Sequence, residues 1–263
     1  MYLIVFLFGL FFGSFLGVLV DRLPREETVI KGRSRCEFCG KELHWIDLIP
    51  VLSFISTEGK CRYCHAPLPY FYPLIELSTG ILFALTYLFL IPNQIINYQL
   101  LVINLFYYLI IISGFVVIFF MDLKYGLILD KILWPLVGII LAYLFIINPQ
   151  SLIINLTCGV LAFLFFLLIA LAFRFIRGKD GMGGGDIKLA FVLGLFLGFP
   201  NIIAALYLAF LTGAIGGIIL ILWKKKSPKK AILPFGPFLI IGTLVCLFWG
   251  NLVLPKVFLF LGI

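Results

Sequence analysis

Two acidic residues, Asp122 and Asp186, stand where apolar segments meet polar sequence. Asp122 directly follows the apolar run 100–121, and Asp186 lies 64 residues later, between the glycine-rich stretch Gly181–Gly185 and the apolar run 187–199. If the two carboxylates meet, their repulsion raises one pKa and the pair shares a proton near neutral pH. One acid can then activate water while the other polarises a carbonyl. The pattern predicts an aspartic-peptidase pair, although each acid alone could also be an interfacial helix cap.

Other residues near these acids are candidates for positioning a substrate. Glycine backbone allows close approach of another chain, so Gly183, Gly184 and Gly185 are expected to leave room for an extended peptide. Lys188 follows on the same segment, and Glu76 lies about one turn inside another apolar run. A carboxylate inside a membrane segment indicates a functional role, but near the interface Glu76 could instead pair with Arg62.

Four cysteines form two CxxC pairs in the extended polar region of the chain. Twenty-one residues separate Cys36-x-x-Cys39 from Cys61-x-x-Cys64. Four thiolates with this spacing can close on one zinc ion and fold a segment too small to build its own core. Two disulfides are the alternative, which a reducing cytoplasm disfavours. We therefore predict a zinc site, with His44 and His65 as bystanders and with Cys158 and Cys246 as small hydrophobic residues.

The elements that must position these residues are membrane helices. The 263 residues are 63% hydrophobic and 12% charged, which is outside the range of soluble domains. We predict an all-α polytopic membrane protein with about eight transmembrane helices and a small zinc-stabilised cytoplasmic loop domain. Segment 187–199 is short for a span and could cross the membrane or be re-entrant. The expected spans are 2–20, 73–91, 100–121, 132–147, 152–173, 187–199, 202–223 and 232–249, and the expected domains are 1–20, 21–70 (the zinc-binding loop) and 71–263 (the peptidase domain).

The distribution of charge predicts the orientation in the membrane. The formal net charge is +8, and one alternating topology places 19 of the 20 Lys and Arg residues on the same side. The positive-inside rule makes this side cytoplasmic. Because short loops divide the charge among them, we expect no nucleic-acid partner. The lysine-rich run 224–230 is a topology anchor that could also hold anionic lipid heads.

Several motifs together resemble the bacterial type IV prepilin peptidases, which are GxGD intramembrane aspartic peptidases, over nearly the whole chain. Gly17, Leu129 and Phe71 depart from the asparagine, proline and arginine usual in that family. The matching motifs are Gly13-Ser14-Phe15-Leu16, Arg22-Leu23-Pro24, the double CxxC loop, Tyr72-Pro73-Leu74-Ile75-Glu76-Leu77, the stretch 122–130, the stretch 181–189 and Pro234-Phe235-Gly236-Pro237.

This resemblance implies an activity, a location and cofactors. Family members cleave the basic leader from prepilins and pseudopilins at the cytoplasmic face of the bacterial inner membrane. Many also N-methylate the new amino terminus with S-adenosylmethionine, an activity that the family links with its N-terminal part. The resemblance makes Asp122 and Asp186 the catalytic pair and the four cysteines the zinc ligands.

Three other functions remain open from the residues alone. A peptidase without methyl transfer would use the zinc loop as a structural support. A proton-coupled transporter would use the two acids as a relay, but it favours acids near mid-membrane and inverted repeats. A zinc-bearing membrane scaffold would not shorten a prepilin at all.

Overall fold

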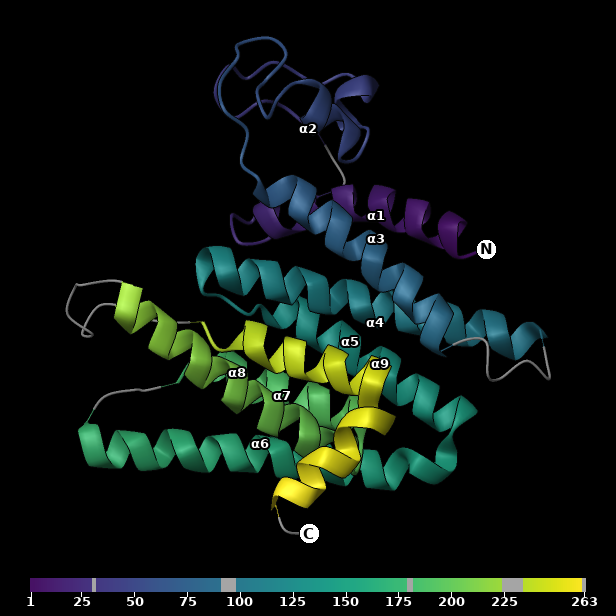
Figure 1. Cartoon of the computed structure of the whole chain (residues 1–263), viewed down its shortest axis with the longest axis vertical. Coiled ribbons are helices and arrows are strands. Elements are labelled where there is room, and N and C mark those ends of the chain that lie inside the picture. Colours follow the sequence, from purple (N-terminus) through teal and green to yellow (C-terminus); the bar gives the residue numbers. More distant parts are fainter. Residues whose placement is uncertain (30–31, 91–97, 179–181, 224–233, 262–263) are drawn as a thin grey trace. The chain divides into compact units, whose positions relative to one another are not determined.

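The chain is built almost entirely from helices. A computed structural model describes residues 1–29, 32–90, 98–178, 182–223 and 234–261 (Figure 1), and this part of the chain contains two isolated β-bridges but no strand. The elements in chain order are α1 (Tyr2–Arg22), η1 (Trp45–Leu48), α2 (Leu52–Ser56), α3 (Phe71–Leu90), α4 (Tyr98–Tyr125), α5 (Asp130–Ile147), α6 (Pro149–Arg177), α7 (Gly184–Leu197), α8 (Asn201–Trp223) and α9 (Gly236–Leu261).

Seven of the described helices are long and apolar enough to cross a membrane. They are α1, α3, α4, α5, α6, α8 and α9. The remaining expected span corresponds to α7, which has 14 residues and is ~21 Å long at ~1.5 Å per residue, less than the ~30 Å of a hydrocarbon layer. The predicted all-α membrane architecture is confirmed. The lysine-rich run 224–230 lies outside the described residues.

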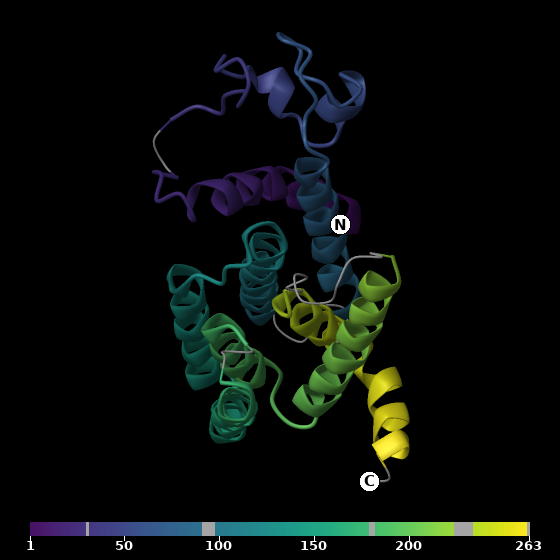
Figure 2. The ribbon, with the colours of Figure 1, turned by 90° about the vertical axis from the view of Figure 1, so that its left-hand side faces the viewer.

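The chain divides into two compact units, unit 1 (Met1–Met121) and unit 2 (Asp122–Ile263). In unit 1, α1 packs across α3, and the described residues 23–29 and 32–70 continue from the ends of these two helices (Figure 2). Glycine makes the crossing close, because a Cβ on Gly13 would lie 2.7 Å from the Cα atom of Glu76. Small residues permit this kind of packing where no hydrophobic effect drives helices together. The contact fixes the position of Glu76 along α1, next to Gly13.

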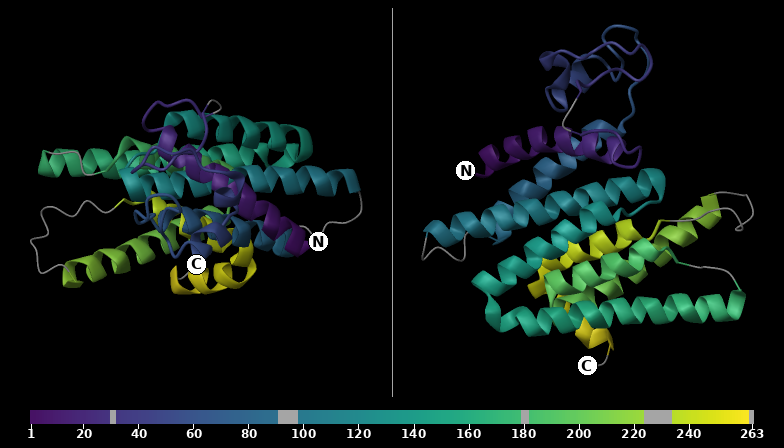
Figure 3. Two further views of the ribbon diagram at one scale, coloured as in Figure 1. Left: turned by 90° about the horizontal axis from the view of Figure 1, so that it is seen from above. Right: turned by 180° about the vertical axis from the view of Figure 1, so that it is seen from behind.

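In unit 2, the short helix α7 forms the centre. It packs along α6 and also contacts α5, α8 and α9, while α8 and α9 run side by side (Figure 3). Leu189, Leu193 and Leu195 are fully buried, and the side-chain amide of Asn155 on α6 donates to the Leu195 carbonyl oxygen at 3.0 Å. A helix that is apolar on all sides is one that protein surrounds. The surrounding helices therefore fix the position of the α7 N-terminus.

Candidate active site and cysteine cluster

Asp122 lies in the last turn of α4, where unit 2 begins. The helix stops at Tyr125 because Gly126 adopts a left-handed φ of 64°, and the Gly126 N–H donates to the Asp122 carbonyl oxygen at 2.9 Å. The side chain of Asp122 is 5% exposed. Its Oδ2 atom is buried and makes no hydrogen bond of good geometry with any residue that the structure describes. Asp122 therefore offers a buried carboxylate oxygen close to the end of a helix.

Asp186 lies in the first turn of α7. Gly183 caps this helix, and the Asp186 N–H donates to the Gly183 carbonyl oxygen at 3.1 Å. Burial is the main cause that raises the pKa of the half-buried Asp186 carboxyl to about 6, and the negative charge of Asp122 is the second cause. The negative charge of Asp122 therefore adds to the effect of burial and disfavours ionisation of Asp186.

Gly236, the first residue of α9, lies against both acids. Its backbone N–H faces Asp186 and limits the rise of the Asp186 pKa. A Cβ on Gly236 would lie 2.6 Å from Asp122 Oδ2 and 3.2 Å from Cδ1 of Ile128. A Cβ on Gly185 would likewise lie 2.8 Å from the Cβ atom of Ile128. The absence of side chains at these two glycines lets α7 and α9 close on Ile128 and on the acids.

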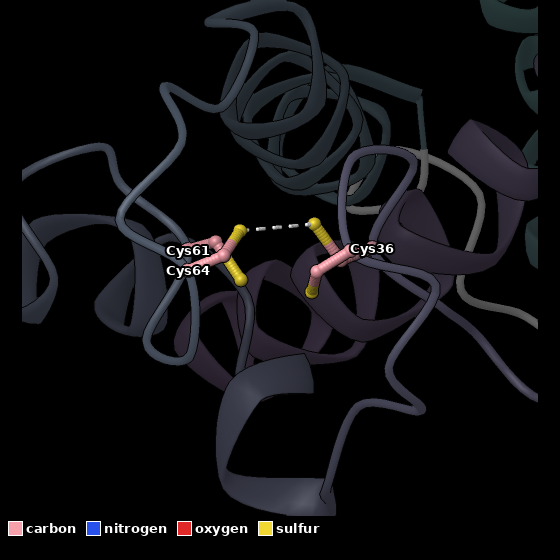
Figure 4. Close-up of side chains that lie close together, drawn as sticks. Cys36, Cys61 and Cys64 are labelled. Atoms are coloured by element: carbon pink, nitrogen blue, oxygen red, sulfur yellow. Dashed lines mark hydrogen bonds between the residues drawn. The ribbon is translucent and has the colours of Figure 1, made fainter.

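The four cysteines of the two CxxC pairs converge on one point in unit 1. Their sulfur atoms all lie within 4.8 Å of one another, and all four residues are free thiols (Figure 4). The Sγ atoms of Cys36 and Cys64 are 3.9 Å apart. A tetrahedral zinc site with Zn–S bonds of ~2.3 Å requires sulfur atoms ~3.8 Å apart. The cluster therefore fits a metal site with four cysteine ligands, and neither His44 nor His65 belongs to it.

Each CxxC pair lies in a turn with the same backbone hydrogen bonds. The N–H of Cys36 donates to the carbonyl oxygen of Lys41, and the N–H of Gly40 donates back to that of Cys36. The second turn repeats the pattern, from Cys61 to Ala66 and from His65 to Cys61. Gly40 and His65 both adopt a positive φ, of 69° and 57°. The repeated turn directs each pair of thiols toward the other.

Comparisons with known proteins show the family of this chain. The "Type IV leader peptidase family" profile matches residues 109–218, and the "Bacterial Peptidase A24 N-terminal domain" profile matches residues 7–90. A prepilin leader peptidase/N-methyltransferase of Aeromonas hydrophila is 32% identical over 94% of this chain and 90% of its own length. This chain belongs to the type IV leader peptidase family. A protein of the same name from Bacillus subtilis (strain 168) is 32% identical with 94% of each chain covered, and no solved structure gives a significant match.

Membership of the type IV leader peptidase family confirms the resemblance read from the motifs. The enzyme class predicted from the sequence is confirmed with it, because the matching profile is that of a peptidase family. The N-methyltransferase half appears in the names of the relatives. The peptidase profile covers Asp122 and Asp186, whereas the N-terminal profile covers all four cysteines and Glu76.

Glu76 in this family member does not pair with Arg62. It is 9% exposed, and its Oε2 accepts a hydrogen bond of 2.7 Å from the backbone N–H of Val51. The Nε atom of Arg62 instead lies 2.8 Å from Asp47, which also accepts a hydrogen bond of 2.8 Å from the hydroxyl of Tyr63. The pairing considered from the sequence is therefore wrong, because Asp47 on η1 lies closer to Arg62 and Glu76 holds the backbone that precedes α2.

Lys188 forms an ion pair in unit 2. Its Nζ atom lies 2.8 Å and 2.7 Å from the two carboxylate oxygens of Asp130, the first residue of α5. Both side chains are about half exposed. This pair ties the N-terminal turn of α7 to that of α5. Of the three glycines expected to make room, only Gly185 is in tight contact, since a Cβ on Gly184 would meet nothing within 4 Å.

Sequence reasoning missed Gly236 and Ile128 as parts of the acid site. Gly236 belongs to the Pro234–Pro237 motif, which matched the family but received no role. Because a glycine has no side chain, its residue type does not indicate that its backbone has a role in a site. Ile128 is one apolar residue among many, and only the packing of α7 and α9 against it distinguishes it.

Proposed function

We propose that this chain is a membrane aspartic peptidase that cleaves the basic leader from prepilins or pseudopilins at the cytoplasmic face of the bacterial inner membrane. Asp122 and Asp186 are its catalytic pair. The observation that carries this proposal is that acids 64 residues apart in sequence both lie against the backbone of Gly236 at the start of α9. Family membership and the names of the relatives support the substrate class.

The reaction requires one proton on the acid pair. The ionised carboxylate takes a proton from water, and the resulting hydroxide attacks the scissile carbonyl carbon. The protonated carboxyl group donates a hydrogen bond to the carbonyl oxygen, which becomes an oxyanion. Collapse of the tetrahedral intermediate breaks the C–N bond, and the leaving amine takes a proton from the pair. Asp122 Oδ2 is suited to this exchange because it is buried beside the backbone of Gly236 and makes no hydrogen bond of good geometry with any residue that the structure describes.

The glycines of the acid site supply the space that a peptide needs. A helical peptide shields its carbonyl groups, so the substrate must be extended beside the acids. Gly183 and Gly184 are exposed at the start of α7, close to Asp186. Because these glycines have no side chains, an extended peptide can lie directly against their backbone groups. Lys188 is assigned a positioning role through its ion pair with Asp130.

The cysteine cluster is proposed to bind one zinc ion as a structural site. Four thiolate ligands complete the tetrahedron and leave no open position for a substrate. Bound zinc would supply folding free energy to residues 21–70 rather than chemistry. The distance between Cys36 and Cys64 supports this assignment. S-adenosylmethionine is proposed as the methyl donor, on the strength of the N-methyltransferase named in the relatives.

The decisive experiment is cleavage of a prepilin peptide by purified protein in nanodiscs. The Asp122→Asn and Asp186→Asn variants should each lose at least ~100-fold in cleavage rate while inserting and folding normally. Asp130→Asn is the matched control, because it makes the same charge change eight residues from Asp122 at an exposed position, and its cleavage rate should fall by no more than about fivefold. Full cleavage by either of the first two variants would remove the proposed pair.

Related preparations separate the alternative functions. A scaffold would leave the prepilin peptide intact with the wild-type protein. A transporter reconstituted in liposomes would move protons across the membrane without shortening the peptide. A peptidase without methyl transfer would release a mature peptide whose mass does not increase when S-adenosylmethionine is added.

A further inference from the structure

Two short helices carry exposed apolar side chains in the segment that joins α1 to α3 and contains the four clustered cysteines (the cysteine-containing segment). η1 and α2 contact each other, and neither helix has a buried residue. Trp45 is 74% exposed, Leu52 65% and Ile55 66%, and Ile46 and Leu48 are exposed as well. We call these five side chains the η1–α2 face. Single exposed apolar residues are ordinary, but a group of them on two adjacent helices marks an interaction surface.

The spacing of these residues gives each helix one apolar side. In a 3₁₀ helix the side chains at positions i and i+3 eclipse one another, so Trp45 and Leu48 lie on the same side of η1. In an α-helix residues three apart are also neighbours, so Leu52 and Ile55 share a side of α2. Each of the two helices therefore exposes an apolar pair rather than scattered residues.

Another side of η1 is fastened to the second CxxC pair. Asp47 is the only charged residue between positions 45 and 56. Its carboxylate lies 2.8 Å from Nε of Arg62 and accepts a hydrogen bond of 2.8 Å from the Tyr63 hydroxyl. Arg62 and Tyr63 are the two residues between Cys61 and Cys64. The charge of η1 is therefore neutralised on the side of the cysteines, with the Asp47 side chain only 9% exposed, while the apolar side chains remain outside.

A hydrogen bond to α3 holds the η1–α2 face beside a membrane helix. The backbone N–H of Val51, between η1 and α2, donates to Oε2 of Glu76 at 2.7 Å. Glu76 is the sixth residue of the membrane-spanning helix α3 and lies ~8 Å along the helix axis from Phe71, at ~1.5 Å per residue. Val51 has a left-handed φ of 60°, which is costly for a β-branched residue, and its bond to Glu76 gives a reason for this conformation. The link between η1 and α2 thus lies alongside α3, not beyond its end.

We propose that the η1–α2 face docks on lipid, in the interfacial layer of the membrane that α1 and α3 cross. Both ends of the cysteine-containing segment are tethered to membrane-spanning helices. Trp45 suits this layer because tryptophan is enriched at membrane interfaces, and leucine and isoleucine side chains reach past the headgroups. Leu74 and Leu77, in the first two turns of α3, are exposed too, so the face continues the lipid contact of that helix. The inference goes beyond the proposed function and does not depend on it.

The charge of the segment indicates that apolar contact, rather than attraction to anionic headgroups, provides the docking. Residues 21–70 contain eight Lys and Arg residues and seven Asp and Glu residues, so their net charge is close to zero. A polybasic surface would need a clear excess of cations to hold anionic lipid. Docking should therefore occur on neutral lipid as well. Because η1 is also fastened to the second CxxC pair, docking fixes the direction in which the cysteine cluster faces the membrane.

The test places a single tryptophan in the η1–α2 face of the full-length protein in nanodiscs. Trp134→Phe, Trp223→Phe and Trp249→Phe together leave Trp45 as the only source of indole fluorescence. An interfacial element lies about 5–10 Å into the headgroup and acyl boundary, so lipids brominated near the headgroup end of their chains should lower Trp45 emission at least ~twofold. The same loss should occur in phosphatidylcholine alone and in mixtures with phosphatidylglycerol.

Phe38 supplies the matched control for this measurement. It is 68% exposed, lies in the same segment between Cys36 and Cys39, and does not belong to the η1–α2 face. Adding Trp45→Phe and Phe38→Trp to the three substitutions moves the single tryptophan to this position. Its emission should be quenched by iodide in the water and should change little with brominated lipid.

Hydrogen exchange gives a second readout in protein that keeps its four tryptophans. Leu52→Ser combined with Ile55→Ser removes two exposed side chains, so it removes lipid contact but little contact within the protein. Amide exchange of residues 45–56 in nanodiscs should become at least ~10-fold faster in this variant. Phe38→Ser is the control, because Phe38 is as exposed as Leu52, and exchange of residues 45–56 should then stay within about twofold of wild type.

Each other occupant of the η1–α2 face gives a different result, and any of these results would overturn the proposal. Trp45 emission that iodide quenches and brominated lipid does not would place the face in water. Protection of Trp45 only in nanodiscs that hold two copies would make the face an interface between copies. Protection only after a prepilin peptide is added would make it a substrate surface. Unchanged exchange after the Leu52 and Ile55 substitutions would also overturn lipid docking, and this measurement decides if the three phenylalanine substitutions prevent folding.

Discussion

Gly236 and Asp122 are in such close contact that no side chain fits between them, since a Cβ on Gly236 would lie 2.6 Å from Oδ2 of Asp122. The residues belong to the start of α9 and the end of α4, which are 114 positions apart in the chain. The backbone of Gly236 also faces Asp186. One peptide group therefore lies beside both acids of the proposed pair.

Gly236→Ala should damage cleavage severely, because the new methyl group must displace the Asp122 carboxylate or move α9. We expect the cleavage rate to fall by at least ~100-fold, as for the loss of an acid–base group. Gly184→Ala is the control, since a Cβ at that position meets nothing within 4 Å. The measurement is prepilin cleavage at saturating peptide. Equal activity of the two alanine variants would contradict the packing of Gly236 against Asp122.

The pH dependence of cleavage should report the raised pKa of Asp186. Burial, with the charge of Asp122, places this pKa at about 6, so the proton that the pair needs is lost as the pH rises through that value. We expect kcat/KM to fall about tenfold for each pH unit above about pH 6. A profile that stays flat to about pH 9 would show that Asp186 does not supply this proton.

The same shift should appear in stability. Below about pH 4 the carboxyl is protonated in both folded and unfolded chains and contributes nothing. Between about pH 4 and pH 6 it ionises only in the unfolded chain, so stability falls with rising pH, and above about pH 6 the full penalty remains. Asp186→Asn removes this penalty, on the order of 3 kcal/mol. Thermal unfolding should show a larger gain in Tm for this variant at about pH 8 than at about pH 4, and a gain independent of pH would contradict the raised pKa.

Breaking the Lys188–Asp130 ion pair should have only a modest effect on cleavage. Both side chains are about half exposed, and exposed pairs contribute about 0–1 kcal/mol. Lys188→Met and Asp130→Asn should each lower cleavage by no more than about fivefold, and the double variant should lose no more than either single variant. A loss comparable to that of Asp186→Asn would instead show direct participation of Lys188 in catalysis.

Removal of the metal should unfold the cysteine-containing segment and leave the acid pair intact. Cys61→Ser should abolish the one bound zinc, measured by mass spectrometry of the metal, and should expose residues 21–70 to proteolysis. Methyl transfer should then fall more than prepilin cleavage does. Cys158→Ala is the control, because Cys158 is buried in α6 and does not belong to the cluster, and this variant should keep its zinc. Equal loss of the two reactions would make the segment a support for the whole enzyme.

The sequence determined the properties that depend on local composition and spacing. Hydropathy alone indicates membrane helices, because a segment must be long and apolar to satisfy its backbone in lipid. The spacing of the cysteines predicted their cluster, since two residues between thiols suit one metal. The motifs around Asp122 and Asp186 indicated the family and its acids.

Tertiary structure decided which groups meet across long separations in the chain. Gly236 and Ile128 join the acids only because α7 and α9 close on them, and neither residue carries chemistry of its own. Glu76 accepts a hydrogen bond from the Val51 N–H, and Arg62 forms an ion pair with Asp47. The charges of the side chains alone suggested an ion pair between Glu76 and Arg62, but in the fold each of them has another partner. Helix packing sets such choices, and it depends on contacts summed over the whole fold, which residue spacing does not contain.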